Sequence, residues 1–211
     1  MSRIITRLFD TFDQAERAVI ALESAGVPKG DISIVSHHKP DHASDLTDAS
    51  IREPRDSTAG EAAGRDAGVG AALGGVIGAG GGVLAGLGLL AIPGLGPVIA
   101  AGWLASAAVG AIVGGAVVAG AGGLVGALTH AGVSREEADV YAEAVRRGGT
   151  LISAKVADDH LAAAEAALGN THAVDVATRR EYYRSTGWTG FDENADPYTD
   201  EQIVRERANV F

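Results

Sequence analysis

The middle of this chain contains no charged side chain. Asp66 and Arg135 are the nearest charges on either side, and the 63 residues from Ala67 to Thr129 are mainly Gly, Ala, Val, Leu and Ile. A segment of this composition has no polar face to present to water, so it must be buried in lipid or in protein. Any fold for this chain must therefore provide that burial.

A turn signal divides the uncharged stretch into two arms. Proline lacks an N–H donor and stops a helix, and glycine favours turns. The arms, residues 67–92 and 98–130, would be helices of about 39 and about 50 Å, each longer than the roughly 30 Å hydrocarbon core of a bilayer. The sequence thus predicts a hydrophobic helical hairpin over residues 67–133, with its turn at Pro93, Gly94, Gly96 and Pro97.

Small residues recur every four positions in both arms. This spacing puts them on one helix face, where two backbones can approach closely, as helices do in lipid. In water each glycine would cost a helix roughly 1 kcal/mol relative to alanine. We therefore expect a glycine zipper that mediates helix packing and homo-oligomer formation through Gly70, Gly74, Gly78, Gly82, Gly86, Gly102, Ser106, Gly110, Gly114, Gly122 and Gly126.

Arginines flank the uncharged stretch on both sides, and Met1 to Phe9 shows no signal peptide. By the positive-inside rule, both termini are expected to be cytoplasmic. The hairpin would either span the membrane or re-enter from one leaflet. Alternatively, the hairpins would be buried against each other in a soluble cytoplasmic assembly. The flanking arginines are Arg52, Arg55, Arg65, Arg135, Arg146 and Arg147.

The two charged halves show a β-α-β pattern. Strands are expected at 3–9, 31–36, 150–156 and 173–177, and capping boxes at Thr11–Gln14 and Ser134–Glu137 begin helices. This order predicts an α+β fold, a ferredoxin-like sandwich interrupted by the hairpin. The predicted segments are 1–50 and 134–180 for the two halves of the domain, 51–66 for a polar linker, 67–133 for the hairpin and 181–211 for a C-terminal tail.

Two of these segments resemble a bacterial family. The sequences IITRLFDTFDQAERAVIALESAGVPKGDISIVS (4–36) and AGVSREEADVYAEAVRRGGTLISAKV (131–156) are similar to parts of heat-induced general stress proteins. The resemblance covers about the first 180 residues. It implies a stress-linked bacterial protein without known catalysis, and it carries no functional residues to this chain.

Composition excludes several classes of function. The net charge is −10 without a basic cluster, which disfavours nucleic-acid binding. The chain has no cysteine, so it has no disulfide, thiolate metal site or cysteine nucleophile. No phosphate-binding glycine motif and no Ser/His/Asp arrangement is present. We expect a protein that is not an enzyme and has no cofactor.

Three of the six histidines, His37, His38 and His42, lie close together after the second predicted strand. Imidazole and the nearby carboxylates suit Zn²⁺, Ni²⁺ or Cu²⁺, so a weak metal site is one interpretation. The alternative is an ordinary polar loop. His130 ends the uncharged stretch, either as a plain interfacial residue or as a pH sensor.

The tail is rich in aromatic residues, with five of the ten in the chain lying between Tyr182 and Tyr198. Aromatic side chains in a polar extension usually dock onto a surface. Trp188, Phe191 and Tyr198 would hold the tail as a strap on its own domain or a neighbour, or dock it onto another protein partner. A third capping box, Thr199–Gln202, would begin a short helix.

Together these features predict a non-enzymatic, stress-associated protein of the bacterial inner membrane. Its partners would be the lipid bilayer and further copies of itself, and it would organise or shape the membrane. Two alternatives are open: a soluble self-assembling scaffold or shell subunit, and a small membrane pore. No polar or charged residue marks an ion pathway through the arms.

Overall fold

The computed structural model describes residues 2–37, 88–92, 94–113 and 123–210. The described chain mixes helices and strands, so the predicted α+β class is confirmed. Its elements are β1 (Ser2–Phe9), α1 (Phe12–Ser24), the 3-10 helix η1 (Lys29–Asp31), β2 (Ile32–Ser36), β3 (Gly88–Ile92), β4 (Gly96–Ala101), α3 (Trp103–Val113), α4 (Gly123–His130), α5 (Arg135–Arg146), β5 (Thr150–Ala157), α6 (Leu161–Gly169), α7 (Val176–Ser185) and α8 (Asp200–Val210).

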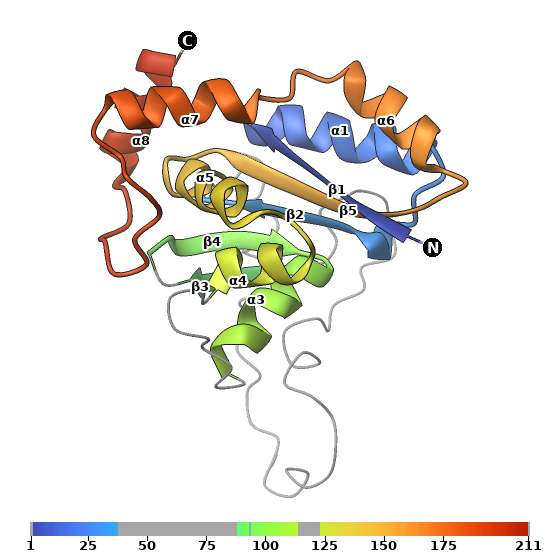
Figure 1. The fold of residues 1–211 in the computed structure, drawn as a ribbon, viewed down its shortest axis with the longest axis horizontal. Helices are drawn as coiled ribbons and strands as arrows, with labels where there is room; N and C mark the ends of the chain where they lie inside the picture. The colour runs from blue at the N-terminus through green and yellow to red at the C-terminus, as the bar shows by residue number, and fades with distance from the viewer. Residues whose placement is uncertain (1, 38–87, 93, 114–122, 211) are drawn as a thin grey trace, which may run out of the picture.

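The described strands form one antiparallel sheet in the order β1-β5-β2-β4-β3. Strand β5 lies between β1 and β2 (Figure 1), with Ala154 opposite Ile5 on one side and Ile32 on the other. The segments before and after the glycine-rich stretch therefore share one sheet. That stretch contributes β3 and β4, which extend the sheet beyond β2.

Each face of the sheet carries its own apolar core (Figure 1). Helices α1 and α6 cover one face, where Phe9, Leu22 and Ile152 are buried. Helices α3, α4 and α5 cover the other, where Leu128 and Val145 are buried. Successive side chains of a strand point to opposite faces, so the neighbours Leu151 and Ile152 of β5 lie in different cores.

Helix α1 begins as its capping signal predicts. The Gln14 backbone N–H donates to Thr11 Oγ1 at 3.3 Å. The reciprocal bond from the Gln14 side chain is not formed, since Gln14 Oε1 has no hydrogen-bond partner in the described residues. Half of this capping box is therefore present. The box at Thr199 is complete, with Gln202 N donating to Thr199 Oγ1 and Thr199 N donating to Gln202 Oε1.

The predicted fourth strand at 173–177 is wrong. Residues 172–175 are irregular and α7 begins at Val176. Asp175 caps this helix by accepting from Thr178 N at 2.7 Å, and a capped first turn competes with strand pairing. One sheet-like contact is made here, from Val174 N to Leu8 O at 2.8 Å on the outer edge of β1.

The predicted helical hairpin is also wrong where the structure describes it. Pro93 lies outside the described residues, while Gly94 and Gly96 adopt positive φ in a turn. This turn joins two strands, β3 and β4, and Pro97 lies within β4. The physical reason is pairing: β4 hydrogen-bonds to β2, with Ile99 opposite Ser36, and so satisfies its backbone in a sheet rather than in a helix.

After β4, the described part of the second predicted arm contains the helices α3 and α4. Within the described residues, no helix combines the length and the apolar character needed to cross a bilayer. Helix α4 packs between α3 and α5, with Leu124, Val125 and Leu128 buried. Of the predicted zipper residues, Gly70, Gly74, Gly78, Gly82, Gly86, Gly114 and Gly122 lie outside the described residues, while Gly102 lies between β4 and α3, Ser106 and Gly110 are in α3, and Gly126 is in α4.

Helix α3 is fixed to the sheet at its first turn. Leu104 N donates to Ser33 Oγ at 2.9 Å, and the Trp103 indole N–H donates to Asp31 O at 3.2 Å. The Lys155 ammonium lies 4.4 Å from the centre of the Trp103 ring, a cation–π contact. The chain reaches this position through Gly102, whose φ is +84°.

Replacing Gly102 with Ala should destabilise the fold by about 2–4 kcal/mol. A Cβ there would lie 2.6 Å from Ser33 Oγ, and a left-handed backbone disfavours any L side chain. The control is Gly190→Ala, because a Cβ at Gly190 meets no atom within 4 Å among the described residues. Urea unfolding of the two variants measures the difference. Equal stabilities would show that the turn at Gly102 is not tight.

Candidate functional site

The C-terminal turn of α5 buries three charged side chains. Glu143 is 0% exposed, Arg146 is 9% exposed and Arg147 is 8% exposed. The spacing of three and four residues places them on neighbouring positions of one helix face. Charged side chains are rarely buried to this extent unless they are paired, so this turn is the most unusual polar feature of the described fold.

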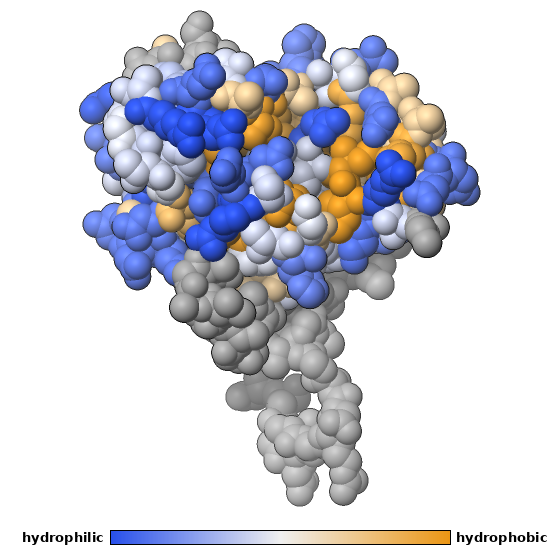
Figure 2. Space-filling model, in the orientation of Figure 1, coloured by the Kyte–Doolittle hydropathy of each residue, from blue (hydrophilic) through white to orange (hydrophobic). Residues whose placement is uncertain are grey.

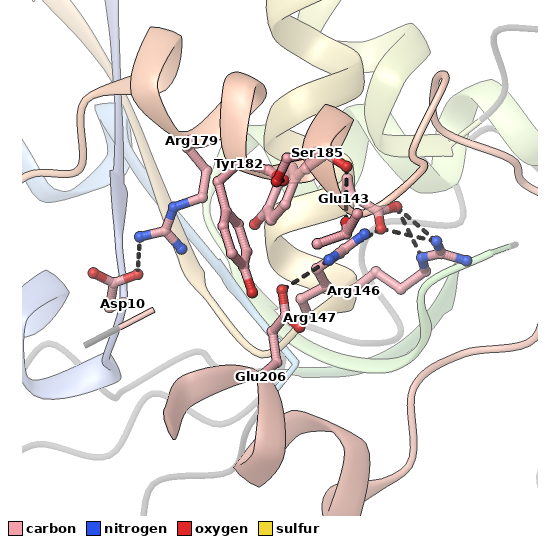
Figure 3. Close-up of polar contacts among 10 residues, drawn as sticks. Asp10, Glu143, Arg146, Arg147, Arg179, Tyr182, Ser185 and Glu206 are labelled. Atoms are coloured by element: carbon pink, nitrogen blue, oxygen red, sulfur yellow. Dashed lines mark hydrogen bonds and ion pairs between the residues drawn. The ribbon is translucent and has the colours of Figure 1, made fainter. Parts of the chain in front are cut away.

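Glu143 accepts hydrogen bonds from both arginines (Figure 3). Arg146 donates from Nε at 3.0 Å and from NH2 at 2.9 Å, which makes a bidentate pair. Arg147 donates from Nε to Glu143 Oε1 at 2.6 Å. Bidentate and charge-assisted bonds are the strong class of hydrogen bond, and here they hold one carboxylate between two guanidinium groups.

The C-terminal tail completes this cluster from the other side. Glu206 of α8 accepts from Arg147 NH1 at 2.7 Å. The Arg147 guanidinium lies 4.2 Å from the ring centre of Tyr183 in α7, and that of Arg146 lies 5.2 Å from the ring centre of Tyr198. We call this set the arginine clasp: Glu143, Arg146, Arg147, Tyr183, Phe191, Tyr198 and Glu206.

Further contacts attach α7 and α8 on either side of the clasp. Arg179 of α7 donates to Asp10, which follows β1, at 2.6 Å (Figure 3). Arg207 of α8 donates to Gly148 O at 2.8 Å. Gly148 ends α5 with a φ of +93°, and a Cβ there would collide with Ile203 of α8. The tail thus packs against the end of α5. A side chain at position 148 would prevent this packing.

The clasp and the nearby core shift several pKa values. Burial pulls the pKa of Arg147 down, but its hydrogen bonds to Glu206 and Glu143 outweigh burial and raise it. Burial raises the pKa of the Tyr183 hydroxyl. Burial, helped by the negative charge of Glu137, raises the pKa of Tyr141 on α5 to about 12. Arg147 therefore stays charged, and Tyr141 and Tyr183 stay neutral, at physiological pH.

The predicted docking residues of the tail contact the protein's own domain. Trp188 and Phe191 pack against the core under α5, and Tyr198 lies beside both arginines of the clasp. This geometry matches the interpretation of the tail as a strap. Docking onto a separate protein stays a prediction.

Two of the arginines that flank the uncharged stretch in the sequence, Arg146 and Arg147, are buried and bonded to Glu143. The cytoplasmic placement of this flank stays a prediction. Sequence reasoning missed Glu143 altogether. The sequence signal that could have identified it is a glutamate followed by arginines three and four positions later. These residues lie just before Gly148 and Gly149, which end the predicted helix.

The structure describes one of the three predicted metal ligands. His37 follows β2, while His38 and His42 lie outside the described residues. In the part of the chain that is described, no three His, Asp or Glu side chains are grouped closely enough to hold a metal ion. His130 is exposed at the end of α4. The weak metal site stays a prediction.

Comparison with known proteins identifies no relative: no family model, no curated protein and no solved structure matches this chain.

Replacing Glu143 with Gln should lower the free energy of unfolding by about 3–5 kcal/mol, because two buried guanidinium groups lose their shared carboxylate. The control is Glu136→Gln, which breaks an exposed pair with Arg180 and should cost less than about 1 kcal/mol. Urea titration of both variants measures this. A loss at Glu143 as small as that at Glu136 would mean that the clasp does not hold the fold.

Stability should also fall at high pH. The pKa of Tyr141 is about 12 in the folded protein against an ordinary value of 10.0, so the unfolded chain loses this proton first as pH rises. The stabilisation is complete below pH 10 and declines between about pH 10 and 12, by roughly 2–3 kcal/mol. Tyr141→Phe should remove this part of the decline in urea titrations at pH 9 and 11.5. An identical decline in both proteins would contradict the assignment.

Proposed function

We propose that this chain is a non-enzymatic protein that self-associates through its uncharged elements β3, β4, α3 and α4. The observation that supports this proposal most strongly is the distribution of charge over the fold. Every Asp, Glu, Lys and Arg lies before residue 67 or after residue 133, so these four elements carry none. They lie together on one side of the molecule, away from α1 and α6 (Figure 1). The segment that joins α7 to α8 reaches their edge, where Phe191 and Pro197 lie close to Gly94 and Gly96.

Helix α3 supports this proposal most directly. Its sequence, WLASAAVGAIV, contains no charged residue and a single hydroxyl group, that of Ser106, although a surface helix normally has one polar side. Leu104, Ala105 and Ala108 pack into the domain, while Ser106 is exposed. Ser106 stands four residues from Gly110, and small residues at this spacing permit close approach by another backbone. A second copy of the chain is a partner with matching chemistry.

The described part of the face shown in Figure 2 mixes hydrophilic and apolar residues, with hydrophilic side chains lying between and around the apolar ones. The buried charged side chains of α5 bond to each other and to the tail, which is a structural use of charge. These observations support a protein that acts by assembly rather than by catalysis.

For the sheet we propose a ferredoxin-like arrangement to which the hairpin β3-β4 has been added. Two observations support it. Strands β1, β5 and β2 are antiparallel neighbours with α1 and α6 on one face. The segment around Val174 lies at the outer edge of β1, where a fourth strand of a β-α-β-β-α-β domain would pair, and makes one backbone bond there.

Burial of the uncharged elements in a bilayer is the second candidate function. The observation that favours it is the uncharged stretch from Ala67 to Thr129, which extends well beyond β3, β4, α3 and α4. In that case the protein would organise or shape the bacterial inner membrane from the cytoplasmic side. The alternative location is a cytoplasmic assembly. The resemblance of residues 4–36 and 131–156 to general stress proteins supports a stress-linked role in either location.

Placing a charge on α3 tests self-association. Ser106→Lys should weaken it at least tenfold, because a desolvated ammonium would have to be buried at the contact. The matched control, Ser185→Lys, puts the same charge on the exposed face of α7 and should leave association unchanged. Sedimentation velocity over a concentration series measures the association of both variants and the wild type. Unchanged association in Ser106→Lys would overturn the role of α3.

A second variant and a lipid assay separate the two candidates. Replacing Gly74, Gly78 and Gly82 together with Leu tests whether the predicted zipper contributes to the same oligomer. Flotation with phosphatidylcholine and with anionic vesicles tests the membrane. A protein that forms oligomers without floating is a soluble assembly, and one that floats but loses flotation in Ser106→Lys uses the uncharged elements on lipid. A wild-type monomer that does not float contradicts both candidates.

A further inference from the structure

A small cavity lies beside the arginine clasp, between the ends of β1 and α5 and the two tail helices. It encloses about 20 Å³, and its polar lining consists of Asp10, Arg147, Arg179, Tyr183, Glu206 and Arg207. A cavity needs roughly 10–15 Å³ of such volume to hold one water molecule. This one therefore has room for a single particle of water size or slightly larger.

The lining carries more positive than negative charge. Three guanidinium groups face two carboxylates, Asp10 and Glu206. Glu206 is bound by Arg147 at 2.7 Å and Asp10 by Arg179 at 2.6 Å. Arg207 donates to a neutral acceptor, the carbonyl oxygen of Gly148. One positive charge is thus left over at the cavity.

Two hydrogen-bond donors of the lining have capacity for a further acceptor. Arg207 Nε is buried and has no hydrogen-bond partner among the described residues. The hydroxyl of Tyr183, which lines the same cavity, can donate its proton to an acceptor there. Burial raises the pKa of Tyr183, so this proton is retained at neutral pH. A buried donor without an acceptor is unfavourable and calls for an explanation.

We propose that this cavity binds one small monovalent anion of the halide class, held by Arg207 Nε, the Tyr183 hydroxyl and the surplus positive charge. A water molecule would satisfy the donors but leave the surplus positive charge of the lining without a counter-charge. Phosphate and sulfate exceed the space, and their charge exceeds the surplus. The site draws residues from α5, α7, α8 and the end of β1, so the bound anion stabilises the docked tail.

The first test compares anions in thermal unfolding. Sodium chloride or bromide should raise the apparent Tm of the wild-type chain above that in sodium gluconate of equal ionic strength. The expected rise is about 4 °C for each tenfold increase above the dissociation constant. Arg207→Gln should abolish the difference, because it removes the surplus charge. The control Arg205→Gln, an exposed arginine two residues away on α8, should retain it.

The second test uses the wild-type protein alone, so it does not depend on the folding of a variant. Crystals grown in sodium bromide should show an anomalous peak between Arg207 Nε and the Tyr183 hydroxyl. A wild-type Tm that is equal in halide and gluconate, or a cavity that contains water in the bromide crystal, would overturn the proposal. A halide effect that persists unchanged in Arg207→Gln would also overturn it, because the anion would then bind elsewhere.

Discussion

The burial of the Glu143 carboxylate is the constraint on which the described fold most depends. An ionised carboxylate with no exposed surface is tolerated only when cations are bonded to it, and Arg146 and Arg147 supply two. Both arginines are nearly buried in turn, which requires cover from elsewhere. Tyr183, Tyr198 and Glu206 of the tail provide it. The end of α5 can be buried in this way only when the tail is docked.

This coupling changes how the C-terminal segment should be regarded. The sequence shows a polar, aromatic extension after the last predicted strand, which would ordinarily be treated as an appendage. In the structure its apolar residue Ile203 is 1% exposed against Gly148, and Tyr183 is 1% exposed in the core under α5. Buried contacts of this kind make α7 and α8 part of the domain. A partner for the tail would have to compete with these contacts.

The sequence predicts the elements whose signals are local. The helix starts at Phe12, Arg135 and Asp200 follow capping residues whose bonds span only three positions, and those bonds are formed. The ends of α1 and α5 follow from Gly26 and Gly148, which adopt positive φ. Strands β1, β2 and β5 follow from β-rich runs between these helices. None of these inferences needs information about distant residues.

The failures occur where the outcome depends on distant partners. A Gly/Ala-rich run without charges fits a helix or a buried strand equally well, because no polar face marks a period. Residues 96–101 form a strand because β4 pairs with β2. This pairing joins distant parts of the chain, since Val35 lies 65 positions from its partner Ala100. The clasp likewise joins Arg147 to Glu206 across 59 positions. At 173–177 a local signal was present but misjudged, since Asp175 caps a helix within a run of strand-like composition.

The two ends of the sheet differ in a way that bears on how copies would meet. At the β1 end, the outer edge is occupied: the Arg7 guanidinium donates to Thr6 O, Val174 N donates to Leu8 O, and Arg3 lies near Asp158. Charges and irregular backbone at an edge strand prevent further pairing. The β3 end is built from Gly88–Ile92, within the uncharged stretch, and no charged side chain of the described residues belongs to β3, β4, α3 or α4. Among the described residues, charges and irregular backbone therefore protect the β1 end, whereas the strands at the β3 end carry no charge of their own. The β3 end also contains α3, which is why self-association is proposed for these elements rather than for the charged side of the domain.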